Sequence, residues 1–174
     1  LQGGSGPAAG AVIDVAVAAE RDGRLLAIEG TYRMDAGGLP GLSPSLLMQA
    51  SAALYQCPNL HLEGFDVVTN KPRTEAYRGP GGIQAAFAME QAMDMLCQEL
   101  GLDPLHFRKR NAAVTGCTMP IGTPFPAIGL TTILDAVGRH PSWLDPIGTG
   151  AYPRGRGLAL GYWRGTSMTS ARSA

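Results

Sequence analysis

The sequence has 174 residues, a formal net charge of zero, 45% hydrophobic residues and 16% charged residues. A chain of this length and composition can bury a core and is neither disordered nor strongly solvated. The balanced charge gives no support for binding nucleic acid, and no apolar run is long enough to span a membrane.

Glycine and proline, with 24 and 13 residues, gather in short stretches that indicate turns between short elements. The three cysteines, Cys57, Cys97 and Cys117, are far apart and lack the spacing of metal ligands. Zinc or iron–sulfur ligation within this chain is therefore not expected. Nothing at the N-terminus resembles a secretory signal. We expect buried thiols and a cytoplasmic protein.

Two strands joined by a tight turn open the predicted fold. Residues 1–11 form a flexible lead rich in glycine, alanine and serine. Residues 12–19 alternate as a strand, and Arg21-Asp22-Gly23 contains the Asp-Gly pair that is typical of hairpin turns. The returning strand is predicted over residues 24–34. Its core candidates are Leu26, Ile28 and Tyr32.

A helix and a third strand follow. Ser43 and Pro44 suit the N-cap and first position of a helix, which is predicted over residues 44–55. Its inward positions are Leu47, Ala50 or Ser51, and Leu54. Residues 61–69 are predicted to form the third strand.

The most informative stretch covers residues 76–84, with the sequence Ala-Tyr-Arg-Gly-Pro-Gly-Gly-Ile-Gln. It places an arginine and a glycine-rich turn directly before an amphipathic helix. Backbone N–H groups at a helix N-terminus, together with a fixed cation, favour an anionic or oxo-bearing ligand. Glycine also lets a ligand approach the backbone closely.

The helix after this turn shows the clearest periodicity in the chain. Apolar residues at helical spacing predict one buried stripe, made of Ile83, Phe87, Met89, Met93, Leu96 and Leu100. Polar residues predict the outer face, with Glu90, Gln91, Asp94 and Gln98. The group Met89, Met93 and Met95 is interpreted as core filling. Gly101 suits the end of the helix.

The remaining elements are shorter. Asp103 and Pro104 begin a short capped helix, a further helix is predicted near residues 131–137, and a strand is predicted over residues 157–163. Strands and helices alternate irregularly, so the predicted class is α+β, with a mixed sheet and packed helices.

Three stretches together resemble the molybdenum-cofactor-binding subunit of the xanthine dehydrogenase/aldehyde oxidase family of molybdenum hydroxylases. The first is the turn at residues 76–84, which is similar to the family's Ala-aromatic-Arg-Gly-x-Gly turn. The second is Phe87-Ala88-Met89-Glu90 followed by residues 100–104, Arg108 and Asn111. The third is residues 156–161, Arg-Gly-Leu-Ala-Leu-Gly. Their order and spacing are specific, whereas the turn alone would be weak.

The resemblance implies a molybdopterin site at the turn. In this family the turn arginine lies beside the molybdenum centre, so Arg78, Gly79, Pro80 and Gly81 are the expected cofactor-binding residues. No residue of this chain is expected to be catalytic or to ligate a metal. In the family, the position equivalent to Pro80 often holds an aromatic residue that stacks on the substrate. The proline in this chain therefore argues against purines such as xanthine. Gly79 stands where carbon-monoxide-oxidising relatives have cysteine, which argues against that activity.

The resemblance covers only part of the family's catalytic subunit. The Gly-x-Gly-Glu segment that supplies the catalytic glutamate has no counterpart in these 174 residues. We therefore expect residues 12–174 to be a partial molybdenum-cofactor-binding domain, inactive alone, from an oxidoreductase that hydroxylates an aldehyde or N-heterocycle carbon. The implied partners are the remainder of that subunit, iron–sulfur and FAD-carrying domains or subunits, and a small-molecule substrate.

Other interpretations of the same residues stay open. The chain could be a non-catalytic binding or assembly module that retains the fold; a dinucleotide or phosphate site is weaker, because the turn matches neither GxGxxG nor a Walker loop. Arg78 could form a salt bridge, for example with Glu75, or a helix-capping contact. Glu90 could be a general base, a structural hydrogen-bonding group or a solvated residue. Helix capping and local polar contacts account for Asp103, Arg108 and Asn111. The three histidines, His61, His106 and His140, share no metal spacing.

Overall fold

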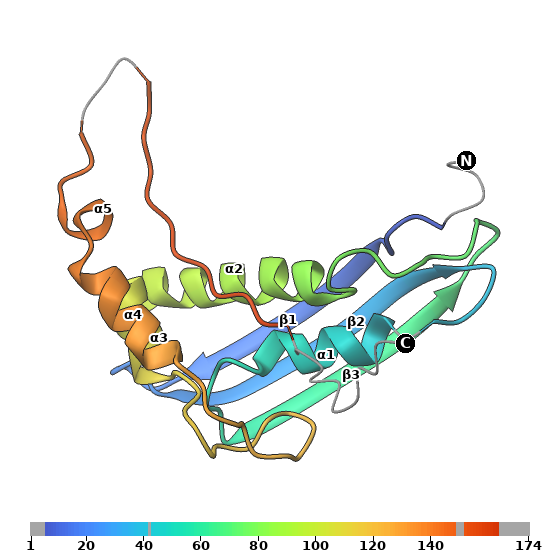
Figure 1. The fold of residues 1–174 in the computed structure, drawn as a ribbon, viewed down its shortest axis with the longest axis horizontal. Helices are drawn as coiled ribbons and strands as arrows, with labels where there is room; N and C mark the ends of the chain where they lie inside the picture. The colour runs from blue at the N-terminus through green and yellow to red at the C-terminus, as the bar shows by residue number, and fades with distance from the viewer. Residues whose placement is uncertain (1–5, 42, 149–151, 164–174) are drawn as a thin grey trace, which may run out of the picture.

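The computed structural model describes residues 6–41, 43–148 and 152–163. A three-stranded mixed sheet forms one layer, with the order β1 (Ala11–Ala19), β2 (Leu25–Gly37) and β3 (Asn59–Val68). The β1–β2 pair is antiparallel and the β2–β3 pair is parallel. Helices α1 (Ser43–Ala52) and α2 (Gly82–Leu100) lie side by side over one face of this sheet (Figure 1). The predicted α+β class is confirmed.

The β1–β2 hairpin follows the predicted alternation except at its turn end. Ile13, Val15 and Val17 point inward from β1, and Ile28 and Tyr32 are buried on β2. The prediction that Leu26 is a core residue is wrong, because the register shifts beside Ala18 and Ala19. A bulge reverses the side-chain alternation locally, so Leu25 faces the core instead.

Helix α1 ends earlier than predicted. It stops at Ala52, and the chain turns so that Tyr55 forms an isolated antiparallel bridge with Ala112. The inward positions Leu47, Ser51 and Leu54 are buried as expected. The strand predicted at residues 61–69 begins two residues earlier, at Asn59, and ends at Val68.

The predicted buried stripe of α2 is wrong at its first two positions. Ile83 and Phe87 are 62% and 72% exposed, and Met95 is also exposed rather than core filling. The buried face instead consists of Ala85, Met89, Glu90, Met93 and Cys97. The buried face of α2 thus includes small residues and the Glu90 carboxylate, whereas the pattern of hydrophobic residues predicts large apolar side chains there. The helix ends at Gly101, which has φ +66° as the C-cap, as predicted.

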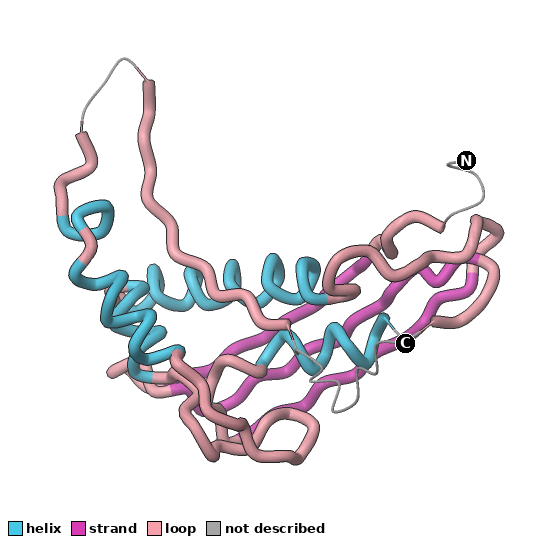
Figure 2. Tube along the Cα trace, viewed as in Figure 1, coloured by secondary structure: helices cyan, strands magenta, loops and turns pink. Residues whose placement is uncertain are grey.

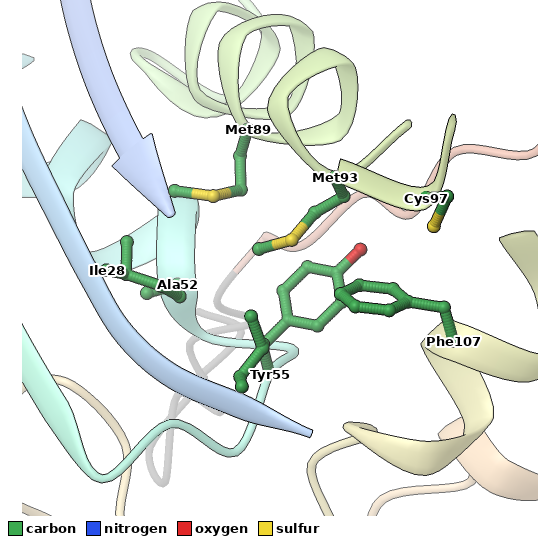
Figure 3. Close-up of a cluster of buried hydrophobic side chains, with 8 residues drawn as sticks. Ile28, Ala52, Tyr55, Met89, Met93, Cys97 and Phe107 are labelled. Carbon is green, nitrogen blue, oxygen red and sulfur yellow. The ribbon is translucent and has the colours of Figure 1, made fainter. Parts of the chain in front are cut away.

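One core cluster lies between α2, the sheet and the next helix. Met89, Met93 and Cys97 of α2 face Ile28, Ala52, Tyr55 and Phe107 (Figure 3). Phe107 belongs to α3 (Pro104–Arg110), whose N-cap Asp103 accepts the His106 N–H at 2.7 Å, as predicted for this Asp-Pro start. Both methionine side chains fill irregular space among larger rings.

The last described elements form a small arm beside α3. Helices α4 (Leu130–Arg139) and α5 (Pro141–Leu144) follow a long loop (Figure 2). Residues 152–163, here called the return segment, run back from this arm to the space between α2 and α1 (Figure 1). The strand predicted at 157–163 is wrong: within the described ranges the return segment pairs with no strand. In the same described ranges no helix is long and apolar enough to cross a membrane.

Asp35 ties the end of β2 to the chain after β3. Its carboxylate accepts hydrogen bonds from Lys71, from the Thr69 hydroxyl at 2.7 Å and from the Gly37 N–H at 3.1 Å. The hydrogen bonds from Lys71, Thr69 and Gly37 lower the pKa of Asp35 to about 2.

This depressed pKa predicts acid sensitivity. A carboxyl whose pKa is lower in the folded state stabilises the fold above its unfolded pKa, and this stabilisation is lost as the pH falls toward the folded pKa. We expect thermal melting points to fall between about pH 4 and pH 2. The Asp35→Asn variant should show a shallower fall over that range. Identical slopes in the two proteins would contradict the assignment.

Candidate functional site

The predicted turn has an unusual backbone just before α2. Arg78, Gly79 and Gly81 have φ values of +31°, +68° and +81°. Glycine adopts such angles without steric cost, but arginine does so rarely, so the Arg78 backbone is strained. Strained backbone of this kind persists only where the surroundings hold it in place.

The turn leaves backbone donors at the start of α2. The Gly82 N–H bonds the Gly79 carbonyl at 2.9 Å, and the Ala85 N–H bonds the Gly81 carbonyl at 2.9 Å. The N–H groups of Ile83 and Gln84 have no backbone acceptor among the described residues. These free donors, at the positive end of the helix dipole, are a feature that anion sites use.

The glycines of the turn are packed against other parts of the chain. A Cβ on Gly81 would lie 2.9 Å from the Leu47 backbone nitrogen. A Cβ on Gly79 or Gly82 would lie 3.2 Å from the Trp163 ring. Internal packing therefore excludes a side chain at Gly81 and leaves little room for one at Gly79 and Gly82, independently of any ligand. Trp163 is a neighbour of the turn that sequence reasoning missed, because the local pattern assigned it to a strand.

Arg78 itself projects into solvent, and Pro80 is half-buried. The alternative salt bridge between Arg78 and Glu75 is wrong: among described residues Arg78 has no ion pair, and Glu75 lies 3.8 Å from Arg73. The Arg78 side chain is thus available on the same short turn as the free N–H groups. Residues 78–81 directly precede α2, and their role in cofactor binding stays a prediction.

Glu90 lies under the turn helix in a buried polar network. Its Oε1 accepts the Tyr55 hydroxyl at 2.5 Å, and its Oε2 accepts the Arg108 Nε–H at 2.9 Å and the Leu160 N–H at 2.8 Å. The Glu90 and Arg108 side chains are 7% and 0% exposed. Of the open interpretations, the structural hydrogen-bonding role is confirmed and the solvated one is wrong. A carboxylate with both oxygens occupied is poorly placed to act as a base.

The charges of this network support one another. Burial lowers the pKa of Arg108, but the interactions with Tyr55 and Glu90 outweigh it, so the net pKa of Arg108 is raised. Burial, reinforced by the Glu90 charge, raises the pKa of Tyr55 well above its ordinary value. Arg108 therefore stays charged and Tyr55 stays neutral, which suits a structural network.

Comparison with known proteins decides the family. The model of the molybdopterin cofactor-binding domain matches residues 4–112, more than half of the chain. The chain belongs to this family. It is 32% identical to aldehyde oxidoreductase of Megalodesulfovibrio gigas over 87% of this chain. It is also 32% identical to a probable xanthine dehydrogenase subunit of Bacillus subtilis over 74% of this chain.

Solved structures agree with this assignment. The aldehyde oxidoreductase of Desulfovibrio gigas superposes with a TM-score of 0.71 at 36% identity, covering 76% of this chain and 15% of that chain. Quinoline 2-oxidoreductase of Pseudomonas putida 86 gives 0.67 at 25% identity, covering 75% of this chain and 18% of that chain. The chain spans 17% and 18% of the two curated relatives named above.

The other polar candidates of this molybdopterin cofactor-binding domain are structural. Asn111 is buried, accepts the Leu25 N–H at 2.9 Å and donates to the Gly23 and Phe107 carbonyls. His140 accepts the Ser142 N–H as a cap. In the described residues no group of three His, Cys, Asp or Glu side chains could hold a metal ion. The three cysteines are free thiols; Cys97 is buried as predicted, but the prediction is wrong for Cys57 and Cys117, which are only partly buried.

An apolar cleft is lined in part by Trp163, the same residue whose ring packs against the turn. Its volume is ≈ 800 Å³, and Phe125, Ile128, Ile133 and Trp163 are among its lining residues. The Phe125 ring meets the Tyr162 ring edge-on at 5.8 Å. No local motif marks this cleft, because its walls come from the loop before α4, from α4 itself, from Leu54 and from the return segment.

Proposed function

We propose that the chain is part of the catalytic subunit of a molybdenum hydroxylase, and that Arg78, Gly79, Pro80 and Gly81 form one wall of its molybdenum-cofactor pocket. The observation that carries this proposal is the coincidence of an exposed arginine and free helix N–H groups on one turn of a molybdopterin cofactor-binding domain. These donors fit a group that bears a phosphate and oxo ligands.

When bound, the molybdenum cofactor would supply the oxidation of a substrate carbon with oxygen derived from water. This chain's residues would hold and orient it. Ile83 and Gln84 would offer backbone donors, and Arg78 would add a fixed positive charge. The strained Arg78 backbone would be held by the packing of the turn.

The substrate class we favour is an aldehyde or an N-heterocycle. Relatives of both kinds appear among the matched proteins, as aldehyde oxidoreductase and quinoline 2-oxidoreductase. Pro80 offers no aromatic ring for stacking on a purine. We further propose that electrons leave through iron–sulfur and FAD partners, and that the free thiols reflect a cytoplasmic setting.

A second function has one observation in its favour. Trp163 and Leu47 explain the small residues of the turn without any ligand. A non-catalytic binding or assembly module that retained the fold would show the same packing. The two proposals differ over Arg78: the first requires its side chain for cofactor binding, and the second does not.

Molybdenum content tests the choice. We expect the longer polypeptide encoded around this segment to purify with stoichiometric molybdenum, measured by mass spectrometry, and the 174-residue chain alone to retain none. Arg78→Met should lower the molybdenum content, because it removes the fixed charge at the turn. Arg73→Met, on a nearby exposed ion pair, is the matched control. Full molybdenum content in both variants would show that Arg78 does not hold the cofactor, whereas no molybdenum in the unaltered longer polypeptide would favour the assembly module.

A further inference from the structure

The return segment is fixed by very few polar contacts. Among described residues, its only backbone group with a recorded hydrogen bond is the Leu160 N–H, which bonds Glu90 Oε2 at 2.8 Å. The side chain of Arg156 holds the far end, where it bonds the Trp143 and Asp145 carbonyls and stacks on the Trp143 ring at 5.7 Å. Near the turn, Glu90 supplies the one backbone hydrogen bond of the segment among described residues, beside the Tyr162 side chain, which contacts the Phe125 ring and bonds the Met119 sulfur at 3.8 Å.

Trp163 lies three residues beyond Leu160 and packs against the turn. The hydrogen bond at Leu160 therefore restricts where the Trp163 ring can lie. The ring lies 3.2 Å from the position that a Cβ would take on Gly79 or on Gly82. Gly79 directly follows Arg78, whose backbone is strained. A ring packed on Gly79 and Gly82 restricts the alternative backbone angles that the turn could otherwise adopt.

We infer that Glu90 is a positioning residue for the turn: through the Leu160 N–H it seats the Trp163 ring on Gly79 and Gly82, and this contact holds the Arg78 backbone. Glu90 suits this role because Tyr55 bonds its Oε1 and Arg108 bonds the same Oε2 that accepts the Leu160 N–H, so the carboxylate is fixed. A charged acceptor also gives a stronger hydrogen bond to the Leu160 N–H than a neutral one would. The significance for cofactor binding rests on the proposed function, whereas the anchoring itself does not.

Amide exchange in the unaltered chain gives the first test. The Leu160 N–H should exchange more slowly than those of Ala159 and Gly161, which have no recorded acceptor among the described residues. NMR-detected exchange measures each amide separately. Exchange of Leu160 as fast as its two neighbours would overturn the inference.

Tryptophan fluorescence gives the second test. In a Trp143→Phe background, Trp163 is the single tryptophan of the chain. Leu160→Pro removes the N–H donor and leaves the Glu90–Arg108 pair intact, but it also removes a side chain that packs against two core clusters. Leu160→Ala, which keeps the N–H, therefore controls for the lost packing and should leave quenching near the wild-type value. Because the Trp163 side chain is already about half exposed (47%), its release should roughly double the acrylamide quenching constant.

Ala159→Pro is the matched control, because it places proline one residue earlier at an N–H with no recorded acceptor among described residues. It should leave the quenching constant unchanged. Glu90→Ala should behave as Leu160→Pro does, and Glu90→Gln, which keeps an acceptor oxygen, should restore most of the wild-type value. Far-UV circular dichroism confirms that each variant is folded. Equal quenching in the wild type and Leu160→Pro would overturn the inference.

In the longer polypeptide, Leu160→Pro should also lower molybdenum content, whereas Ala159→Pro should not. If Leu160→Pro releases Trp163 but keeps a normal molybdenum content, the turn does not need the Trp163 contact. That result would overturn the inference about Glu90 and leave the proposed function standing. Absence of molybdenum from the unaltered polypeptide would instead contradict the proposed function.

Discussion

Replacing Arg108 with alanine is expected to lower the free energy of unfolding by about 3–5 kcal/mol. The guanidinium is fully buried, lies 2.8 Å from Glu90 and 2.9 Å from Asp94, and also bonds the Pro104 carbonyl. Its removal leaves the Glu90 carboxylate buried without a positively charged partner. An unpaired buried charge is among the largest decreases in unfolding free energy that one substitution can cause. Urea unfolding followed by circular dichroism measures the change.

Lys109→Ala is the control for this experiment. The Lys109 ammonium lies 2.7 Å from Asp135, but both side chains are substantially exposed. Water screens such a pair, so we expect a loss below about 1 kcal/mol. Substituting both partners of the buried pair, as Glu90→Leu with Arg108→Met, should recover much of the stability because no charge is left unpaired. A loss for Arg108→Ala as small as that for Lys109→Ala would show that the buried network is not formed in solution.

Local signals in the sequence were enough to predict most elements. The Asp-Gly turn, the Asp103-Pro104 helix start and the Gly101 helix end each depend on the conformational preferences of a few adjacent residues. The structure confirms all three. The glycine-rich turn before α2 was also found this way, since an arginine and several glycines before a helix form a contiguous motif.

Tertiary contacts explain what the sequence did not reveal. Burial of Glu90 depends on Arg108, 18 residues away, so helical periodicity placed this carboxylate on the outer face. The residue buried at the start of β2 depends on a bulge that no local pattern marks. The contact of Trp163 with the turn joins two segments that are distant in sequence, and only the path of the return segment brings them together.

Gly81→Ala is expected to lower the free energy of unfolding by about 3 kcal/mol, as the sum of left-handed backbone strain and overpacking. Gly81 has φ +81°, and an added Cβ would lie 2.8 Å from the Leu47 Cβ, 2.9 Å from its nitrogen and 3.0 Å from its Cα. Backbone atoms inside a packed helix cannot move aside as a flexible side chain can. Urea unfolding again measures the loss.

Gly101→Ala separates the two contributions. Gly101 has a similar φ of +66°, but nothing lies within 4 Å of an added Cβ. It should therefore lose only the backbone contribution, about 1 kcal/mol. Equal losses in the two variants would contradict the close contact between the turn and Leu47.

The outcome also bears on the function of the turn. If packing against Leu47 alone requires glycine at position 81, that glycine is no evidence for a ligand. The same holds for Gly79 and Gly82 beneath Trp163. Arg78 differs from them, because no contact among the described residues explains its side chain. The cofactor proposal therefore depends on Arg78 and on the free donors of α2, and Arg78→Met tests it more directly than any glycine substitution.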